Sequence, residues 1–242
     1  MPLLNRDFIR EILLKDAGFA RSHGAIAEKE FLSTALMIFS LVYMLPAKKA
    51  LVLGSGAGFI PRIVRQAQRE VPDEKFLSEA ETLFVDACIE ERSNYQFFCQ
   101  EYPDVEFLRM TTDSAFEKLK MRRFDYLHID ADHTHAQSLK DFENYLTLMD
   151  DEFVITIHDT AIYYRGDGSV PQTIGHLRRE MLPGGKYEDL EMINFNNLDR
   201  NSQFHFGGDC KCVGLALIKP KKRMLMDTSF APIAAGLFRG EL

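Results

Sequence analysis

The sequence lacks an apolar run long enough to cross a membrane. Its longest candidate, residues 35–46, is shorter than the roughly 18 to 20 residues that a bilayer-spanning helix requires. Residues 1–7 carry an acid early and do not show the charged, apolar and small-residue pattern of a signal peptide. We therefore expect no membrane segment and a location in the cytoplasm.

Cysteine and excess positive charge are also scarce. The 242 residues include only four cysteines, Cys88, Cys99, Cys210 and Cys212. Their spacing fits no paired Cys-x-x-Cys zinc motif, and they are too few for a disulfide scaffold, so reduced and partly buried thiols are the favoured interpretation. The net charge of −7 disfavours a nucleic-acid partner, because binding to phosphates requires a positive surface.

What the sequence does contain is a regular alternation of short apolar runs and helical segments. The apolar runs predict strands at residues 50–53, 82–85, 105–110, 126–129 and 153–157. Two further runs, 191–195 and 213–218, have no strong helix between them and are expected to pair antiparallel. The fold class predicted is α/β: a Rossmann-like, doubly wound, mostly parallel seven-stranded sheet with an antiparallel last pair and N-terminal helices.

No repeat or linker divides the chain, so we expect one domain over residues 1–242. Helices over residues 5–18 and 28–45 form an N-terminal helical cap, residues 1–47. The Rossmann-like core follows as residues 48–218, and residues 219–242 form a C-terminal tail. Residues 70–81 show no clear pattern and are assigned to a surface segment.

Polar residues and glycines follow every one of the five parallel strands. They are the loop from Gly54 to Gly58, then Asp86, Thr112-Asp113, Asp130-Ala131-Asp132-His133, and His158-Asp159-Thr160. Ligands of open parallel sheets bind at the carboxyl ends of the strands, which is where all of these residues fall. A single acid there is usually a helix cap or a solvated loop residue, but five such strand ends together indicate a binding site.

The glycine loop indicates a nucleoside-containing ligand. Its pattern is Gly54-x-Gly56-x-Gly58, and Phe59 stands where the dinucleotide-binding fingerprint has its third glycine. Glycines allow a ligand to approach the backbone closely, although a structural tight turn explains such a loop equally well. Asp86 follows the next strand, where a carboxylate can accept hydrogen bonds from both hydroxyls of a ribose.

The order of these segments resembles class I S-adenosylmethionine-dependent methyltransferases. The similarity lies in Leu51-Val-Leu-Gly-Ser-Gly-Ala-Gly58, Phe84-Val-Asp86, Tyr126-Leu-His-Ile-Asp-Ala-Asp-His133 and Ile155-Thr-Ile-His-Asp-Thr160. Within that class the chain is most similar to metal-dependent small-molecule O-methyltransferases of the catechol and caffeoyl-CoA type, and to bacterial relatives that act on sugars and antibiotics. The chain departs from the family in having Val52 two residues before the first glycine, and Asp150-Asp151-Glu152 before the fifth strand.

The resemblance implies a role for each matching residue. The cofactor-binding residues that it implies are Gly54, Ser55, Gly56, Gly58, Asp86, Asp113, Ser114 and Asp130. Asp130 and Asp159 match the carboxylates that bind Mg²⁺ in the metal-dependent branch, and Thr160 stands where relatives often have an Asn ligand. His133 occupies the position of a basic residue, so His133 and Asp130 are the implied catalytic residues.

Two hard carboxylates from neighbouring strand ends suit Mg²⁺, which can orient a hydroxyl and lower its pKa while a base takes the proton. A histidine ligand would instead favour a transition metal. Structural roles are the alternatives: Asp132 as a helix N-cap, His133 or His135 in a solvated helix start, and His158 as a buried core residue.

We therefore expect S-adenosylmethionine-dependent methyl transfer, with metal-assisted O-methylation of a small-molecule hydroxyl as the favoured reaction. The expected partners are that acceptor and a second copy of the chain in a homodimer. Two other hypotheses are an NAD-dependent oxidoreductase and a non-catalytic S-adenosylmethionine-binding module. The missing third glycine and the lack of an evident Tyr-x-x-x-Lys pair count against the oxidoreductase.

Overall fold

A computed structural model describes residues 34–54, 58–87, 102–161, 169–195 and 214–221 of the chain. Outside these ranges lie the expected first helix at residues 5–18, the helix expected at residues 90–102 apart from Tyr102, and the expected C-terminal tail apart from residues 219–221. Within the described residues, no helix is both long enough and apolar enough to cross a membrane.

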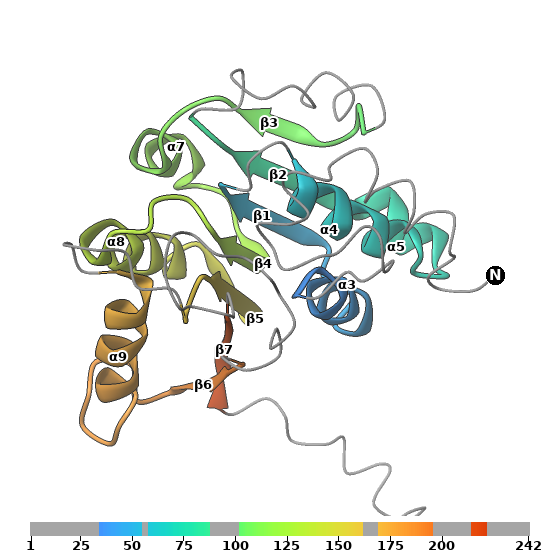
Figure 1. Cartoon of the computed structure of the whole chain (residues 1–242). Coiled ribbons are helices and arrows are strands. Elements are labelled where there is room, and N and C mark those ends of the chain that lie inside the picture. Colours follow the sequence, from blue (N-terminus) through green and yellow to red (C-terminus); the bar gives the residue numbers. More distant parts are fainter. Residues whose placement is uncertain (1–33, 55–57, 88–101, 162–168, 196–213, 222–242) are drawn as a thin grey trace, which may run out of the picture.

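The described elements form a seven-stranded sheet in the order β3-β2-β1-β4-β5-β7-β6 (Figure 1). Its strands are β1 (Lys49–Leu53), β2 (Glu81–Val85), β3 (Glu106–Leu108), β4 (Phe124–Ile129), β5 (Met149–His158), β6 (Leu190–Asn194) and β7 (Leu215–Pro220). Strands β1 to β5 pair parallel with their neighbours, whereas β7 pairs antiparallel with both β5 and β6. The predicted fold class is therefore confirmed, including the antiparallel last pair.

Helices cover both faces of the sheet because the strands alternate apolar side chains between the two faces (Figure 1). One core layer joins residues such as Val52 and Tyr126 to α3 (Thr34–Met44) and α4 (Phe59–Arg69). The other joins residues such as Leu53 and Leu127 to α7 (Thr112–Leu119), α8 (His135–Leu146) and α9 (Val170–Glu180).

The structure corrects the expectation for residues 70–81 and locates the start of α7. Residues 70–81 contain a short helix, α5 (Glu74–Glu79), whose N-cap Asp73 accepts hydrogen bonds from the backbone N–H groups of Lys75 and Phe76. This helix has little apolar periodicity, because Phe76 is its only buried residue. The helix after β3, α7, begins at Thr112 and is capped by the Thr111 side chain, so that Ser114 lies in its first turn.

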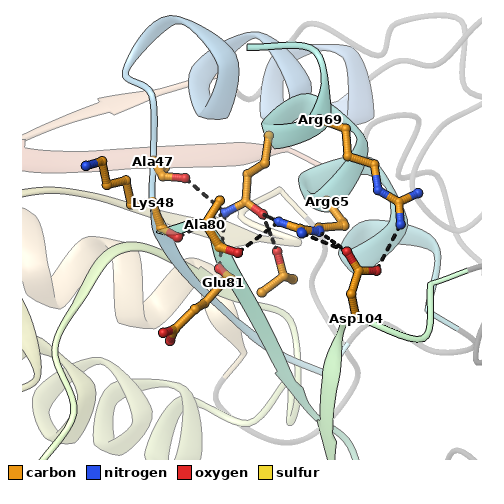
Figure 2. A network of polar contacts seen from close by, with 9 residues as sticks. Ala47, Lys48, Arg65, Arg69, Ala80, Glu81 and Asp104 are labelled. Carbon is orange, nitrogen blue, oxygen red and sulfur yellow. Dashed lines mark hydrogen bonds and ion pairs between the residues drawn. The ribbon is translucent and has the colours of Figure 1, made fainter. Parts of the chain in front are cut away.

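A buried hydrogen-bond network closes the edge of the sheet where β1 and β2 begin, here called the amino edge (Figure 2). The Gln68 side-chain amide donates to the carbonyls of Ala47, Lys48 and Glu81, at 2.9, 3.3 and 3.1 Å. Its oxygen accepts from Thr82 and Arg65, at 2.7 and 2.9 Å. A single side chain thereby ties α4 to the starts of two strands.

Charged groups beside this network are also paired. Asp104 accepts hydrogen bonds from Arg65 and from Arg69 (Figure 2), and the Asp125 carboxylate accepts from the backbone N–H groups of Lys48 and Lys49. The amino edge thus satisfies backbone groups at strand starts that would otherwise be buried without partners.

Candidate active site

The carboxyl edge of the sheet, where the parallel strands end, gathers the predicted site residues. Gly54, Asp86, Asp130 and Asp159 directly follow β1, β2, β4 and β5. Asp113 and Ser114 lie in the first turn of α7, after β3. Ser55 and Gly56 lie outside the described residues. Gly58 lies at the N-cap of α4 in a left-handed conformation (φ 88°).

Gly54 brings the glycine loop against the end of β4. It has a φ of 68°, and a Cβ atom there would lie 2.2 Å from the Asp130 carbonyl oxygen and 2.6 Å from the Ala131 Cα. Both contacts are with backbone, so neither can be relieved by a side-chain rotation. A glycine is therefore required here by packing as well as by conformation, and the end of β1 lies close to Asp130.

Three side chains come together beyond the ends of β4 and β5. Nε2 of His133 lies 2.8 Å from Oδ2 of Asp159 and 3.4 Å from Oδ1 of Asp130. One potential ligand atom from each of these residues lies within 4.8 Å of the others. The register of β4 and β5 produces this arrangement, because Ile129 pairs with Ile157, so that β4 ends immediately before Asp130 and β5 continues one residue further, to His158, before Asp159. We call Asp130, His133 and Asp159 the carboxylate–histidine cluster.

His158 contacts the cluster from the protein interior. Its Nδ1 lies 3.1 Å from Oδ1 of Asp159 and 3.5 Å from Oδ1 of Asp130, and its side chain is only 2% exposed. Beneath it, the His128 ring and the Tyr126 hydroxyl both contact the Thr156 hydroxyl at 2.9 Å. The acids therefore rest on a buried polar layer between β4 and β5.

The backbone at Asp159 is unusual. With φ of 59°, it is the single non-glycine residue with a positive φ among the described residues. Asp is one of the few residue types that tolerate this conformation, and strained residues of this kind cluster at functional sites. The next residue, Thr160, donates its hydroxyl to Oδ1 of Asn194 at 3.1 Å. The third member of the cluster is thus His133 and not Thr160, because the Thr160 hydroxyl contacts Asn194 of β6.

Electrostatics couple the two histidines to the two acids. Burial disfavours a charged imidazole, but Asp130 and Asp159 outweigh burial and raise the pKa of His133 and of His158 to about 10. Burial would raise the pKa of Asp159, but the two histidines outweigh it and lower that pKa. The cluster thus stabilises positive charge beside its two acids.

The residues predicted beside the adenine lie on the surface next to this edge. Asp113 accepts hydrogen bonds from Lys140 at 2.6 Å and from Gln137 at 3.2 Å, both on α8. The Lys140 and Gln137 hydrogen bonds outweigh a small burial effect and lower the pKa of the Asp113 carboxyl. The backbone N–H of Ser114 donates a hydrogen bond to the Thr111 hydroxyl oxygen at 3.3 Å, and Ser114 is exposed.

The sequence interpretation treated His158 as a core residue or a candidate ligand, and did not foresee that it would contact both acids. The available signal was period-two alternation along β5. Thr156 and His158 share one face of that strand, and Thr156 pairs with His128 of β4, so a polar layer leading to the site could have been inferred.

Comparisons with known proteins agree with this fold. Residues 51–160 match the model of a family described as "Methyltransferase domain". No curated protein sequence matches the chain. An O-methyltransferase from Bacillus cereus, solved in complex with SAH (S-adenosylhomocysteine), is 14% identical with a TM-score of 0.63, over 91% of this chain and 94% of that one.

Two further solved structures have the same fold. The O-methyltransferase TomG from Streptomyces achromogenes, in complex with SAM (S-adenosylmethionine), is 13% identical with a TM-score of 0.58, over 84% of this chain and 88% of that one. SAH-bound methyltransferase PaMTH1 from Podospora anserina is 11% identical with a TM-score of 0.54, over 78% of each chain. The resemblance to class I S-adenosylmethionine-dependent methyltransferases is therefore confirmed. Residues 51–160 match the methyltransferase-domain family, and the described residues share the fold of these SAH- and SAM-bound structures.

Proposed function

We propose that the chain is an S-adenosylmethionine-dependent O-methyltransferase that methylates a hydroxyl of a small molecule with the help of a bound divalent cation. The observation that carries the proposal is the carboxylate–histidine cluster, which lies at the carboxyl edge of a methyltransferase domain and directly against Gly54 of the glycine loop.

The sheet topology supports a methyltransferase over the NAD-dependent alternative. Dinucleotide-binding Rossmann domains carry parallel strands in the order 3-2-1-4-5-6. Here an antiparallel β7 lies between β5 and β6. The O-methyltransferases from Bacillus cereus and Streptomyces achromogenes, solved with SAH and SAM, have the same fold.

The cofactor would lie along the ends of β1 and β2. Its methionine part would lie beside the turn that begins at Gly54 and ends at Gly58, both of which have left-handed backbone conformations. The half-buried Asp86 can accept hydrogen bonds from its ribose hydroxyls. The exposed Asp113 and Ser114 at the start of α7 would lie beside the adenine. The methyl group would then point toward Asp130, the residue that Gly54 contacts.

Methyl transfer forms a bond from the acceptor oxygen to the methyl carbon while the carbon–sulfur bond breaks, and S-adenosylhomocysteine is released. Holding the oxygen about 3 Å from that carbon supplies much of the acceleration. The donor set of the cluster fits a divalent cation, which when bound would lower the pKa of the acceptor hydroxyl. Asp130, His133 and Asp159 would hold the cation and orient the acceptor, and the proton of the acceptor hydroxyl would pass to solvent water at the exposed side of the cluster.

Ligand-dependent thermal unfolding tests the cofactor assignment. At about 100 times its dissociation constant, S-adenosylhomocysteine should add about 2.7 kcal/mol to the free energy of unfolding, and NAD⁺ should add nothing. Asp86→Asn should reduce the gain, while Asp150→Asn, an exposed acid at the start of β5, should leave it unchanged. A gain with NAD⁺ alone would instead support the oxidoreductase.

Activity separates an enzyme from a binding module. We expect methyl transfer from S-adenosylmethionine to a member of a panel of catechols, phenols and sugars, measured as S-adenosylhomocysteine released. Binding without turnover across the panel, with and without divalent cations, would favour the non-catalytic module.

A further inference from the structure

The carboxylate–histidine cluster has a donor set that differs from the set of two acids and Thr160 expected from the sequence. Asp130 and Asp159 each contribute carboxylate oxygen, and His133 contributes the Nε2 nitrogen within 4.8 Å of both. The Thr160 hydroxyl is directed to Asn194 on β6. The third donor is thus a nitrogen from the loop after β4.

His133 lies near Asp130 because both residues belong to the short loop between β4 and α8. It lies three residues after Asp130 and one residue before Thr134, the N-cap of α8. The Thr134 hydroxyl accepts from the Gln137 N–H, and Asp132 accepts from the Thr134 N–H at 2.7 Å. These contacts fix the loop, so that the His133 ring reaches across to Asp159 on the next strand.

The carboxylates are held from behind by His158. Its Nδ1 contacts Oδ1 of Asp159, whereas Oδ2 of the same carboxylate faces His133. The two oxygens of Asp159 are therefore divided between an inner, buried partner and the open side of the cluster. His133, 36% exposed in its side chain, lies on that open side. Outer partners of this kind orient the ligands of metal sites.

The chemistry of this donor set selects between classes of cation. Mg²⁺ prefers oxygen ligands in near-ideal octahedral geometry and keeps several waters. Imidazole nitrogen suits first-row transition metals, whereas carboxylate, carbonyl and water oxygens suit Mg²⁺ and Ca²⁺. We propose that the cluster is a binding site for a divalent first-row transition metal, with His133 as a metal ligand and not as the base that deprotonates the acceptor.

The catalytic meaning of this site rests on the proposed function, but metal binding can be measured without methyl transfer. The full chain, freed of metal with a chelator, is titrated with Co²⁺ and followed by its visible absorption and by calorimetry. We expect one Co²⁺ per chain, bound at least about 100-fold more tightly than Mg²⁺, as an imidazole ligand favours.

Variants assign the ligands. His133→Ala should weaken Co²⁺ binding by about tenfold or more and change the absorption bands, yet alter Mg²⁺ affinity by less than about threefold. Asp159→Asn should weaken the binding of both ions. The control is His135→Ala, a half-buried histidine two residues away whose ring contacts Thr173 outside the cluster, and Co²⁺ binding should be unchanged. Circular dichroism of each variant verifies folding.

Three results would overturn the proposal: equal affinity for Mg²⁺ and Co²⁺, unchanged Co²⁺ binding in the His133→Ala variant, or a thiolate charge-transfer band that places Co²⁺ on cysteines. S-adenosylhomocysteine binding is measured on the same preparations. If this ligand binds while Co²⁺ does not, the metal assignment fails and the cofactor assignment stands. If Co²⁺ binds through His133 while S-adenosylhomocysteine does not, the metal site stands and the proposed function fails.

Discussion

The amino and carboxyl edges of the same sheet use polar residues in opposite ways. At the amino edge, the Gln68 amide has five hydrogen-bond contacts, and Asp104 is neutralised by two arginines. At the carboxyl edge, Asp130 and Asp159 lie together in contact with the same histidines. One edge satisfies its polar groups within the fold, and the other concentrates charge beside an open surface.

The two edges also differ in backbone conformation, which is regular at the amino edge and left-handed at several residues of the carboxyl edge. The described strands begin in regular geometry around Lys48 and Glu81, where side chains cap the free backbone groups. The carboxyl edge contains the left-handed Asp159 and the left-handed glycines Gly54 and Gly214. A Cβ at Gly214 would lie 2.5 Å from the Thr160 hydroxyl oxygen, so β7 is packed closely against the loop that carries Asp159. Strained backbone of this kind persists where the surrounding structure enforces it. The same strands therefore carry stabilising contacts at their amino ends and the candidate catalytic residues at their carboxyl ends.

Gln68→Leu should have the largest effect on stability and should break the amino edge alone. The change leaves three backbone carbonyls and the Thr82 hydroxyl without their amide partner, in a buried environment. We expect a loss of about 3–5 kcal/mol in the free energy of unfolding, measured by urea denaturation.

The control for Gln68 is Gln66→Leu on the same helix, where the amide contacts only the Glu70 side chain at the surface. It should change the free energy of unfolding by no more than about 0.5 kcal/mol. Binding of S-adenosylhomocysteine should survive in both variants below their unfolding midpoints. A selective loss of that binding in Gln68→Leu would show that the two edges are coupled.

The sheet was predictable because its signal is local. Buried strands such as Leu51–Leu53 and Leu127–Ile129 are continuous apolar runs, and polar residues after them mark strand ends at one edge. Asp86, Asp130 and Asp159 could be placed at that edge from the strand order alone. The fold therefore follows from patterns that a few consecutive residues contain.

The contacts within the site depend on distances that no local pattern contains. The pairing of His133 with Asp159 requires the β4–β5 register and the positive φ of Asp159, and the direction of Thr160 depends on Asn194, 34 residues later. The Gln68 network escaped prediction for a similar reason. A glutamine within a helix carries no motif, and its partners come from two distant strands.

Asp159→Asn should sharpen the comparison by removing chemistry while keeping the fold. Asn adopts the left-handed conformation as readily as Asp, so the backbone at φ 59° is retained. Methyl transfer, measured as kcat/KM, should fall by about 100-fold or more, a loss of about 2.7 kcal/mol in transition-state stabilisation.

Asp104→Asn at the amino edge is the counterpart. It should lower the unfolding midpoint, because Asp104 neutralises Arg65 and Arg69, and leave kcat/KM within about twofold. Retention of full activity in Asp159→Asn would contradict the assigned role of the carboxylate.

The buried carboxyl of Asp141 on α8 should lower the free energy of unfolding when it is ionised. Burial raises the pKa of the Asp141 carboxyl to about 6, despite hydrogen bonds from Thr112 and Gln137. The pKa of this carboxyl is therefore higher in the folded state than in the unfolded state. Below about pH 4 the carboxyl is protonated in both states. Above about pH 4 it ionises more readily in the unfolded state, which favours unfolding. Stability should therefore fall as pH rises from about 4 to about 6, by about 2–3 kcal/mol from this group.

Asp141→Asn should remove that part of the pH dependence and raise stability at pH 7, measured by urea denaturation across pH 4 to 8. Glu143→Gln on the same helix is the control with the opposite sign. Hydrogen bonds from Lys186 and Tyr187 outweigh burial and lower the pKa of Glu143. Its contribution is present above the unfolded pKa and is lost as pH falls. An unchanged pH profile in Asp141→Asn would show that the carboxyl is solvated.

The smallest effect on stability is expected at the exposed Asp113–Lys140 pair. Variants of this pair distinguish an effect on folding from an effect on ligand binding at the carboxyl edge. The two side chains are about half exposed, at 47% and 51%. Exposed pairs of this kind contribute little, so Asp113→Asn and Lys140→Met should each change the free energy of unfolding by no more than about 0.5 kcal/mol.

Their effects on S-adenosylhomocysteine binding should differ, because only Asp113 is assigned to the adenine. Calorimetry should show weaker binding for Asp113→Asn and little change for Lys140→Met. Equal losses in both variants would mean that the ion pair as a unit shapes the adenine site, and no loss in either would remove Asp113 from it.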